Sequence, residues 1–83
     1  MAHTTDVSYV LADNLRRELE VRGMTQRQLA DDIGVSQPRI AEILAGGNPR
    51  LNTLHKIATA LDLSVAALVS YRVPAEKTLV NSR

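Results

Sequence analysis

The sequence contains no cysteine, tryptophan or phenylalanine, and Tyr9 and Tyr71 are its only aromatic residues. Without cysteine, the chain can form neither disulfide bonds nor thiolate metal sites, and it has no thiol nucleophile. Any core must therefore be built from the aliphatic residues that bring the hydrophobic fraction to 45%. Because the good helix formers leucine and alanine are prominent among them, the composition favours a small all-α protein.

Long apolar runs are also missing. The longest is Val65–Val69, far short of the ~20 residues that a membrane-spanning helix needs. Residues 1–6 lack the basic flank and the apolar stretch of a signal peptide. With 83 residues, we expect one cytoplasmic domain with no membrane partner rather than a multidomain enzyme.

A large excess of charge of one sign is absent as well. The net charge is +1, below the strongly basic value of many nucleic-acid binders. The charges are unevenly distributed, because residues 1–34 carry four arginines against six acidic residues, whereas residues 35–83 carry six basic residues against three acidic ones. If a polyanion binds this chain, we expect the second half to face it.

Apolar spacing and capping signals predict five helices. Leucine at every fourth position predicts a first helix over about 7–22, ended by Gly23. Thr25 and Gln28 have the spacing of a capping box, so a second helix begins directly after Thr25. It ends at Gly34, which supplies the left-handed backbone that other residues resist.

The third and fourth helices are separated by a loop. Ser36 caps the third helix, which ends at about Ala45, and the composition of residues 46–50 is that of a loop. The cap of the fourth helix is either Arg50 or Asn52, and the pattern leaves both open.

Ser64 caps a fifth helix that runs to about Tyr71. The resulting organisation is an N-terminal arm (1–8), a helical domain (9–72) and a C-terminal tail (73–83). The expected buried residues of the first four helices are Leu11, Leu15, Leu19, Leu29, Ala30, Ile33, Ile40, Ile43, Leu44, Leu51, Leu54, Ile57, Ala58 and Leu61.

The second and third helices are joined so closely that they must cross steeply, and Ala30 provides the small side chain where their backbones approach. Seven positions of this pattern are fixed over fifteen residues: Leu29, Ala30, Ile33, Gly34, Val35, Ile40 and Ile43. In this pattern the sequence resembles the Cro/C1-type (XRE) helix-turn-helix family of phage and bacterial repressors. The resemblance covers about residues 11–69 and implies a five-helix, lambda-repressor-like bundle.

The resemblance also implies that the third helix lies in the major groove of double-stranded DNA. Gln37 can offer a donor and an acceptor to adenine, Arg39 can fork onto guanine or pair with a phosphate, and Glu42 can accept from cytosine N4. Pro38 cannot donate or accept through its side chain, so we expect either fewer base contacts or a contact with a thymine methyl group. Gln37 is the foremost candidate for direct base recognition.

A second set of residues is expected to hold the DNA backbone. In related repressors, a glutamine in the first turn of the second helix contacts the DNA backbone and supports the glutamine that contacts a base. The resemblance implies the same role for Gln26. The expected backbone contacts, which position the domain without specifying a sequence, are Gln26, Arg27, Ser36, Asn48 and Arg50.

The sequence departs from the family at one buried pair. Many relatives have an arginine and a glutamate, paired between the first and third helices, where this chain has Leu19 and Leu44. Replacing a buried ion pair by two apolar side chains is often neutral or stabilising, so the expected fold stands.

The same residues could also serve the fold alone. The helix pair could be a structural hairpin with no nucleic-acid partner, and Arg39 and Glu42 could pair with each other for ~0.2–0.5 kcal/mol. No catalytic site, metal or cofactor is expected: Ser36 is better explained as a cap than as a nucleophile beside His55. Asp31 and Asp32 are adjacent and diverge by about 100° around a helix.

We expect a homodimer on two half-sites, with the surface around Val65 and Val69 as the candidate interface, although both valines could be ordinary core. The principal hypothesis is a small sequence-specific repressor. The alternative is an antitoxin that binds a toxin protein and controls its own operon. The run at 36–40 is similar to one in such antitoxins, and residues 1–10 and 74–83 are where a toxin could dock.

Overall fold

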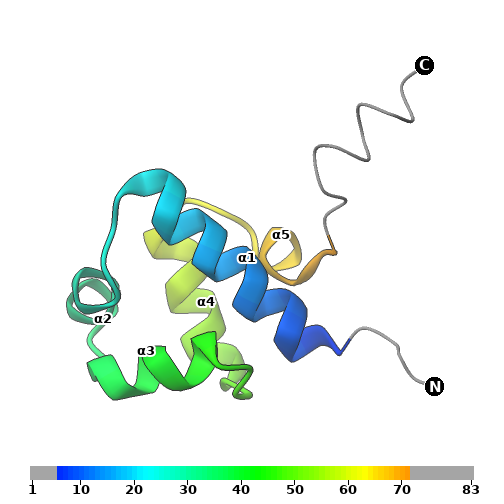
Figure 1. Cartoon of the computed structure of the whole chain (residues 1–83), viewed down its shortest axis with the longest axis horizontal. Helices are drawn as coiled ribbons and strands as arrows, with labels where there is room; N and C mark the ends of the chain where they lie inside the picture. The colour runs from blue at the N-terminus through cyan, green and yellow to red at the C-terminus, as the bar shows by residue number, and fades with distance from the viewer. Residues whose placement is uncertain (1–5, 72–83) are drawn as a thin grey trace.

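Five α-helices and no strands make up residues 6–71, the part of the chain that the computed structural model describes. They are α1 (Val7–Arg22), α2 (Gln26–Ile33), α3 (Gln37–Leu44), α4 (Leu51–Ala60) and α5 (Val65–Val69). Figure 1 shows α1 running diagonally across the molecule, with α4 seen behind it. On one side of α1, α3 runs along the edge of the molecule with α2 beside its start, and α5 lies on the opposite side of α1. The predicted all-α, five-helix bundle is confirmed.

One apolar cluster joins all five helices. Each helix or its cap contributes at least one side chain that is fully buried, and burying a leucine or isoleucine stabilises the fold by ~1.5–3 kcal/mol. The fully buried side chains are Leu15, Leu29, Ile40, Ile43, Ile57, Leu61 and Leu68. The core positions predicted on the first three helices are all buried, so the apolar spacing identified their inner faces correctly.

The prediction that Leu51 is buried is wrong, since 74% of it is exposed. Leu51 is the first residue of α4, ahead of the part of the helix that packs against the core. Ile57 and Ala58 are buried, and Leu54 is half-buried at the edge of the core cluster. The structure also resolves the open question of the cap, because Arg50 occupies that position, without a side-chain hydrogen bond.

The predicted ends of α1 and α5 have different outcomes. Gly23 ends α1 with left-handed backbone (φ +63°), as expected. Ser64 caps α5 through a hydrogen bond from the Ala67 amide, but the helix ends at Val69 and not near Tyr71. Ser70 has extended backbone (φ −89°, ψ 132°), so the chain leaves the helix two residues earlier than predicted.

Asn14 on α1 explains how the end of α5 is held. Only 3% of this residue is exposed, and its Nδ2 donates to the carbonyl oxygens of Leu68 and Ser70, both at 2.8 Å. Its Oδ1 accepts from the guanidinium of Arg17 at 3.1 Å. The buried amide is therefore fully engaged, and it fixes the chain leaving α5 against α1.

Asp6 begins α1 by accepting two hydrogen bonds, from the amide of Ser8 at 3.0 Å and from its hydroxyl at 2.9 Å. These two bonds, the backbone one foremost, lower the pKa of the Asp6 carboxyl below its ordinary value of 3.8, because they favour the charged form. The C-terminal tail (73–83) and most of the N-terminal arm lie outside the described residues, as do most of the segments suggested for toxin docking.

Replacing Asn14 by alanine is expected to lower the free energy of unfolding by about 1–3 kcal/mol, because the carbonyl groups of Leu68 and Ser70, the first of them buried, lose their donor. Asn52 is exposed on α4 and provides the control, with an expected change for Asn52→Ala within ~0.5 kcal/mol. Urea denaturation followed by circular dichroism measures both. Equal stability of the two variants would contradict the structural role of Asn14.

Candidate nucleic-acid interface

The unit formed by α2 and α3 is set by local hydrogen bonds at both ends of α2. The Gln28 amide donates to Oγ1 of Thr25 at 3.0 Å, and the Thr25 amide donates back to Oε1 of Gln28 at 2.7 Å, which is the predicted capping box. At the other end, Gly34 adopts left-handed backbone (φ +74°). The amides of Gly34 and Val35 both donate to the carbonyl of Ala30, at 2.9 and 3.0 Å.

The turn into α3 is equally well defined. Oγ of Ser36 accepts from the amide of Arg39 at 3.2 Å, so the predicted cap of α3 is confirmed. Ala30 is 2% exposed at the approach of the two helices, and Ile40 is fully buried on the inner side of α3. With its inner side held in the core, α3 can turn only one side to solvent.

That side is termed here the outer face of α3. Its exposed residues are Gln37, Pro38, Ala41 and Glu42. The Arg39 side chain is 33% exposed and lies at the edge of this face. All four residues expected to contact bases are therefore accessible, and they come from the first two turns of one short helix.

Arg39 and Glu42 are joined by an ion pair, with Nη1 of the arginine 2.7 Å from Oε1 of the glutamate. The mutual pairing left open by the sequence is thus present. An exposed pair three residues apart on a helix contributes only ~0.2–0.5 kcal/mol. Such a pair holds both side chains over the outer face but yields easily to a stronger partner.

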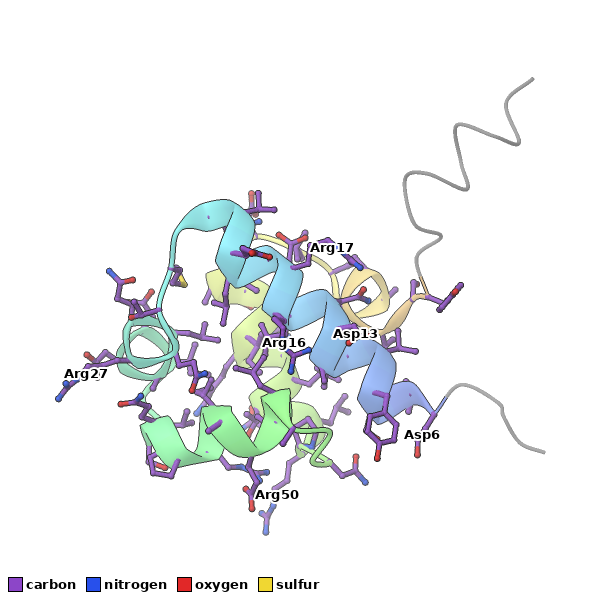
Figure 2. The ribbon with its side chains drawn as sticks, viewed as in Figure 1. Asp6, Asp13, Arg16, Arg17, Arg27 and Arg50 are labelled. Atoms are coloured by element: carbon purple, nitrogen blue, oxygen red, sulfur yellow. The ribbon has the colours of Figure 1, made fainter. Side chains whose placement is uncertain are left out.

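The residues expected to hold the DNA backbone lie in the first turn of α2, at the cap of α3 and in the loop after α3. Gln26 is half-buried and Arg27 exposed in the first turn of α2, while Asn48 and Arg50 are exposed in the loop after α3. Figure 2 shows the Arg27 and Arg50 side chains pointing away from the body of the molecule. Within residues 6–71, no hydrogen bond joins Gln26 to Gln37.

The loop after α3 begins with two glycines, and Gly47 is needed for steric reasons. Its amide donates to the Glu42 carbonyl at 2.9 Å, and a Cβ at this position would lie 2.7 Å from the same oxygen. Only glycine lets the chain pass this close to the end of α3. The loop consequently leaves α3 in a fixed direction, which sets the positions of Asn48 and Arg50.

Sequence reasoning missed Arg16, which ties α1 to the end of α3. Its Nη2 donates to the carbonyl oxygen of Leu44 at 2.7 Å, satisfying a carbonyl that the helix leaves without an internal partner. Figure 2 shows the Arg16 side chain reaching from α1 toward α3. Leu19 and Leu44 are both buried, so apolar packing and this hydrogen bond link α1 to α3.

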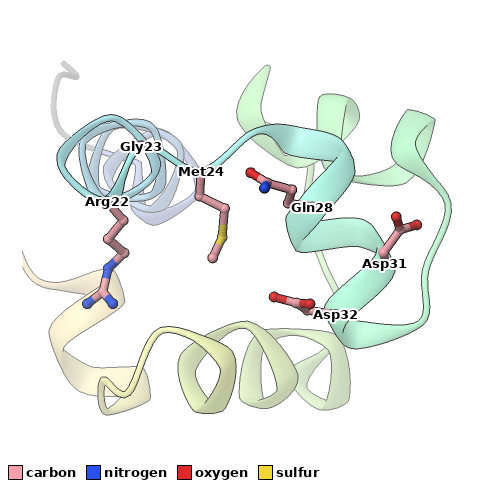
Figure 3. Close-up of a pocket in the computed structure, with 6 residues that line it drawn as sticks. All are labelled: Arg22, Gly23, Met24, Gln28, Asp31 and Asp32. Carbon is pink, nitrogen blue, oxygen red and sulfur yellow. The ribbon is translucent and has the colours of Figure 1, made fainter.

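The acidic pair on α2 borders a hollow in the surface. A surface hollow of about 290 Å³ lies between the end of α1 and α2, lined in part by Asp31 and Asp32. Figure 3 shows the carboxylates of Asp31 and Asp32 pointing in different directions, with that of Asp32 directed toward the side of Met24. Among residues 6–71, no group of three or more histidine, cysteine, aspartate or glutamate side chains is placed to hold a metal ion.

This architecture, two short helices crossing at a glycine turn with one exposed face, is that of a helix-turn-helix protein. Residues 15–68 match the helix-turn-helix family HTH_3, and the chain belongs to this family. The resemblance to Cro/C1-type proteins drawn from the sequence is thereby confirmed. No curated protein matches the sequence. Within the described range, none of the helices has the length and apolar character to cross a membrane.

Several solved structures share the fold. The hypothetical transcription factor NHTF from Neisseria superposes with a TM-score of 0.75 at 25% identity, over 96% of this chain and 94% of that one. The clp gene regulator ClgR from C. glutamicum superposes with a TM-score of 0.71 at 27% identity, over 78% of this chain and 86% of that one. An HTH_3 family transcriptional regulator from Vibrio cholerae superposes with a TM-score of 0.68 at 33% identity, over 77% of this chain and 38% of that one.

Replacing Arg16 by methionine, which keeps an unbranched apolar stem and removes the guanidinium, is expected to lower the free energy of unfolding by about 0.5–1.5 kcal/mol. The figure is modest because the Arg16 side chain is 59% exposed. Amide hydrogen exchange in the last turn of α3 should become faster. Arg27→Met, at an exposed position, serves as the control and should change stability by under ~0.5 kcal/mol. An unchanged rate of amide hydrogen exchange in the Arg16→Met variant would refute the proposed link between Arg16 and the end of α3.

Proposed function

We propose that this chain is a sequence-specific DNA-binding transcription regulator that acts as a repressor, with α3 in the major groove. The observation that carries the proposal is the outer face of α3, which presents an amide, a guanidinium and a carboxylate side by side. Family membership and the similarity to proteins described as transcription regulators support it.

The dimensions of α3 suit this role. An α-helix with its side chains is ~10–12 Å across, and the major groove of B-DNA is ~12 Å wide, so the groove admits one helix. The eight residues of α3 form a rod ~12 Å long. The groove presents a different set of donors and acceptors for each base pair. Side chains that protrude from one short helix can therefore distinguish sequences.

Each side chain of the outer face has a preferred base. Gln37, at the start of α3, can form two hydrogen bonds with adenine, and the Pro38 ring can contact a thymine methyl group. Arg39 can form two hydrogen bonds with guanine. To do so, its guanidinium must give up the hydrogen bond to Glu42. Because that exposed pair is weak, a guanine can compete with it. Glu42 can then accept from a cytosine N4.

Contacts to the DNA backbone would hold α3 in register. Gln26 and Arg27 lie in the first turn of α2, Ser36 caps the start of α3, and Asn48 and Arg50 lie beyond the C-terminal end of α3. Together these residues could grip phosphates on both sides of the groove. Among these residues Arg27 and Arg50 supply the positive charge, so we expect affinity to fall as salt concentration rises.

Repression and dimer formation complete the proposal. A protein bound over a promoter blocks transcription without any further activity. One domain covers few base pairs, so two copies related by a two-fold axis would bind half-sites ~34 Å apart. Val65 and Val69, the candidate interface, are half-buried and pack against the core, which leaves part of each side chain for a partner.

Two substitutions separate recognition of bases from attraction to phosphates. On a preferred site selected from a random DNA pool, Gln37→Ala is expected to lose about 1–3 kcal/mol of binding free energy and to relax the preference at one base pair. Arg50→Ala should weaken binding to all sequences similarly and reduce the salt slope by about 1. Fluorescence anisotropy at several salt concentrations measures both.

The matched control is Asn52→Ala, on an exposed residue of α4 outside the proposed contacts, which should bind as the unmodified protein does. An equal loss on every sequence for Gln37→Ala would contradict direct recognition of bases. Failure of the unmodified protein to prefer any sequence in the pool would overturn the proposed function itself.

A further inference from the structure

Tyr9 lies against the loop that follows α3, although the two are far apart in the sequence. A Cβ on Gly46 would lie 2.8 Å from Cε1 of Tyr9 and 3.1 Å from its Cδ1. Gly46 therefore allows the ring to rest on the loop backbone, and the ring fixes the start of α1 against this loop. No sequence pattern pointed to a role for Tyr9.

The rest of Tyr9 is open to solvent. The residue is 61% exposed, and its hydroxyl has no hydrogen-bond partner within residues 6–71. A ring placed only to fill space against Gly46 would not need a hydroxyl group. A phenol on a rigid support, by contrast, is a hydrogen-bond donor whose position is set before any ligand arrives.

The position of the loop suggests the acceptor. Gly46 precedes Asn48 by two residues and Arg50 by four, and two residues of chain span at most ~7.6 Å. Successive phosphates on one DNA strand are spaced by ~3.4 Å along the helix axis. A strand held by Asn48 and Arg50 would therefore bring another of its phosphates close to the Tyr9 ring.

We infer that the Tyr9 hydroxyl donates a hydrogen bond to a phosphate oxygen of the DNA strand held by the loop after α3. This inference rests on the proposed function and adds a contact from α1, outside the helix-turn-helix unit. Tyrosine is among the side chains that bind phosphate oxygens in protein–DNA complexes. The contact strengthens binding to every sequence alike, since it does not involve a base.

The charges near Tyr9 predict how the contact differs from that of Arg50. The phenol is neutral and releases no counterion when it binds phosphate. Asp6 lies three residues away, and its charged carboxylate opposes an approaching phosphate. Loss of the Tyr9 hydroxyl should consequently lower affinity without changing the salt slope.

The two tyrosines of the chain form a matched pair for the test. Tyr9 is 61% exposed and Tyr71 is 64% exposed, and the latter follows α5. Tyr9→Phe keeps the ring on Gly46 and removes only the hydroxyl. We expect it to weaken binding to the selected site and to unrelated DNA by roughly 2- to 10-fold, with an unchanged salt slope. Tyr71→Phe should bind as the unmodified protein does.

A spectroscopic measurement on the full chain accompanies the affinities. Incorporation of 3-fluorotyrosine gives two ¹⁹F NMR signals, which Tyr9→Phe and Tyr71→Phe assign. Adding the selected duplex should shift the Tyr9 signal and leave that of Tyr71 in place.

The outcomes are distinguishable. If the protein prefers a sequence but Tyr9→Phe binds as tightly as the unmodified protein, the inference is overturned and the proposed function stands. Weakened binding by Tyr9→Ala alone would show that the ring only supports the loop, which also overturns the hydroxyl contact. If the unmodified protein prefers no DNA sequence, the proposed function fails and the inference fails with it.

Discussion

The carbonyl group of Ala30 is the point on which the rest of the structure depends. It accepts hydrogen bonds from the amides of both Gly34 and Val35, and it can do so only because Gly34 adopts left-handed backbone. This arrangement ends α2 and redirects the chain within three residues, so that Ser36 can start α3. Without it, α2 and α3 could not cross at short range, and α3 would not present a separate outer face.

The longest helix, α1, holds this unit in place. Arg16 binds the end of α3, Asn14 binds the end of α5, and Tyr9 packs on the loop after α3. These three contacts come from successive turns of a single helix. The end of α3 and the loop after it are therefore held against α1. A rigid support of this kind is what recognition of adjacent bases requires.

Features that depend on neighbouring residues could be predicted from the sequence. The capping box at Thr25, the glycine turn at Gly34 and the cap at Ser36 are all present, because each is decided by hydrogen bonds between residues at most five apart. The inner faces of α1 to α3 were predicted for a similar reason, since apolar residues at helical spacing have one way to be buried together.

Contacts between distant residues could not be predicted in the same way. Asn14 and Arg16 have polar side chains typical of an exposed helix surface, and only the packing of α5 and α3 gives them carbonyl partners. Leu51 fits the apolar spacing of α4, yet packing begins one turn later. The candidate DNA contacts remain predictions, because a base preference depends on a partner that the chain does not encode. Their exposure on one face is a property of the fold alone.

Nuclear magnetic resonance titration of the ¹⁵N-labelled protein with its selected duplex tests the central claim most directly. We expect the largest shift changes and the intermolecular contacts to base protons to fall on the outer face of α3. Smaller changes are expected in the first turn of α2 and in the loop after α3. Base contacts concentrated on α5 or on the last turn of α1, with α3 unaffected, would contradict major-groove recognition by α3.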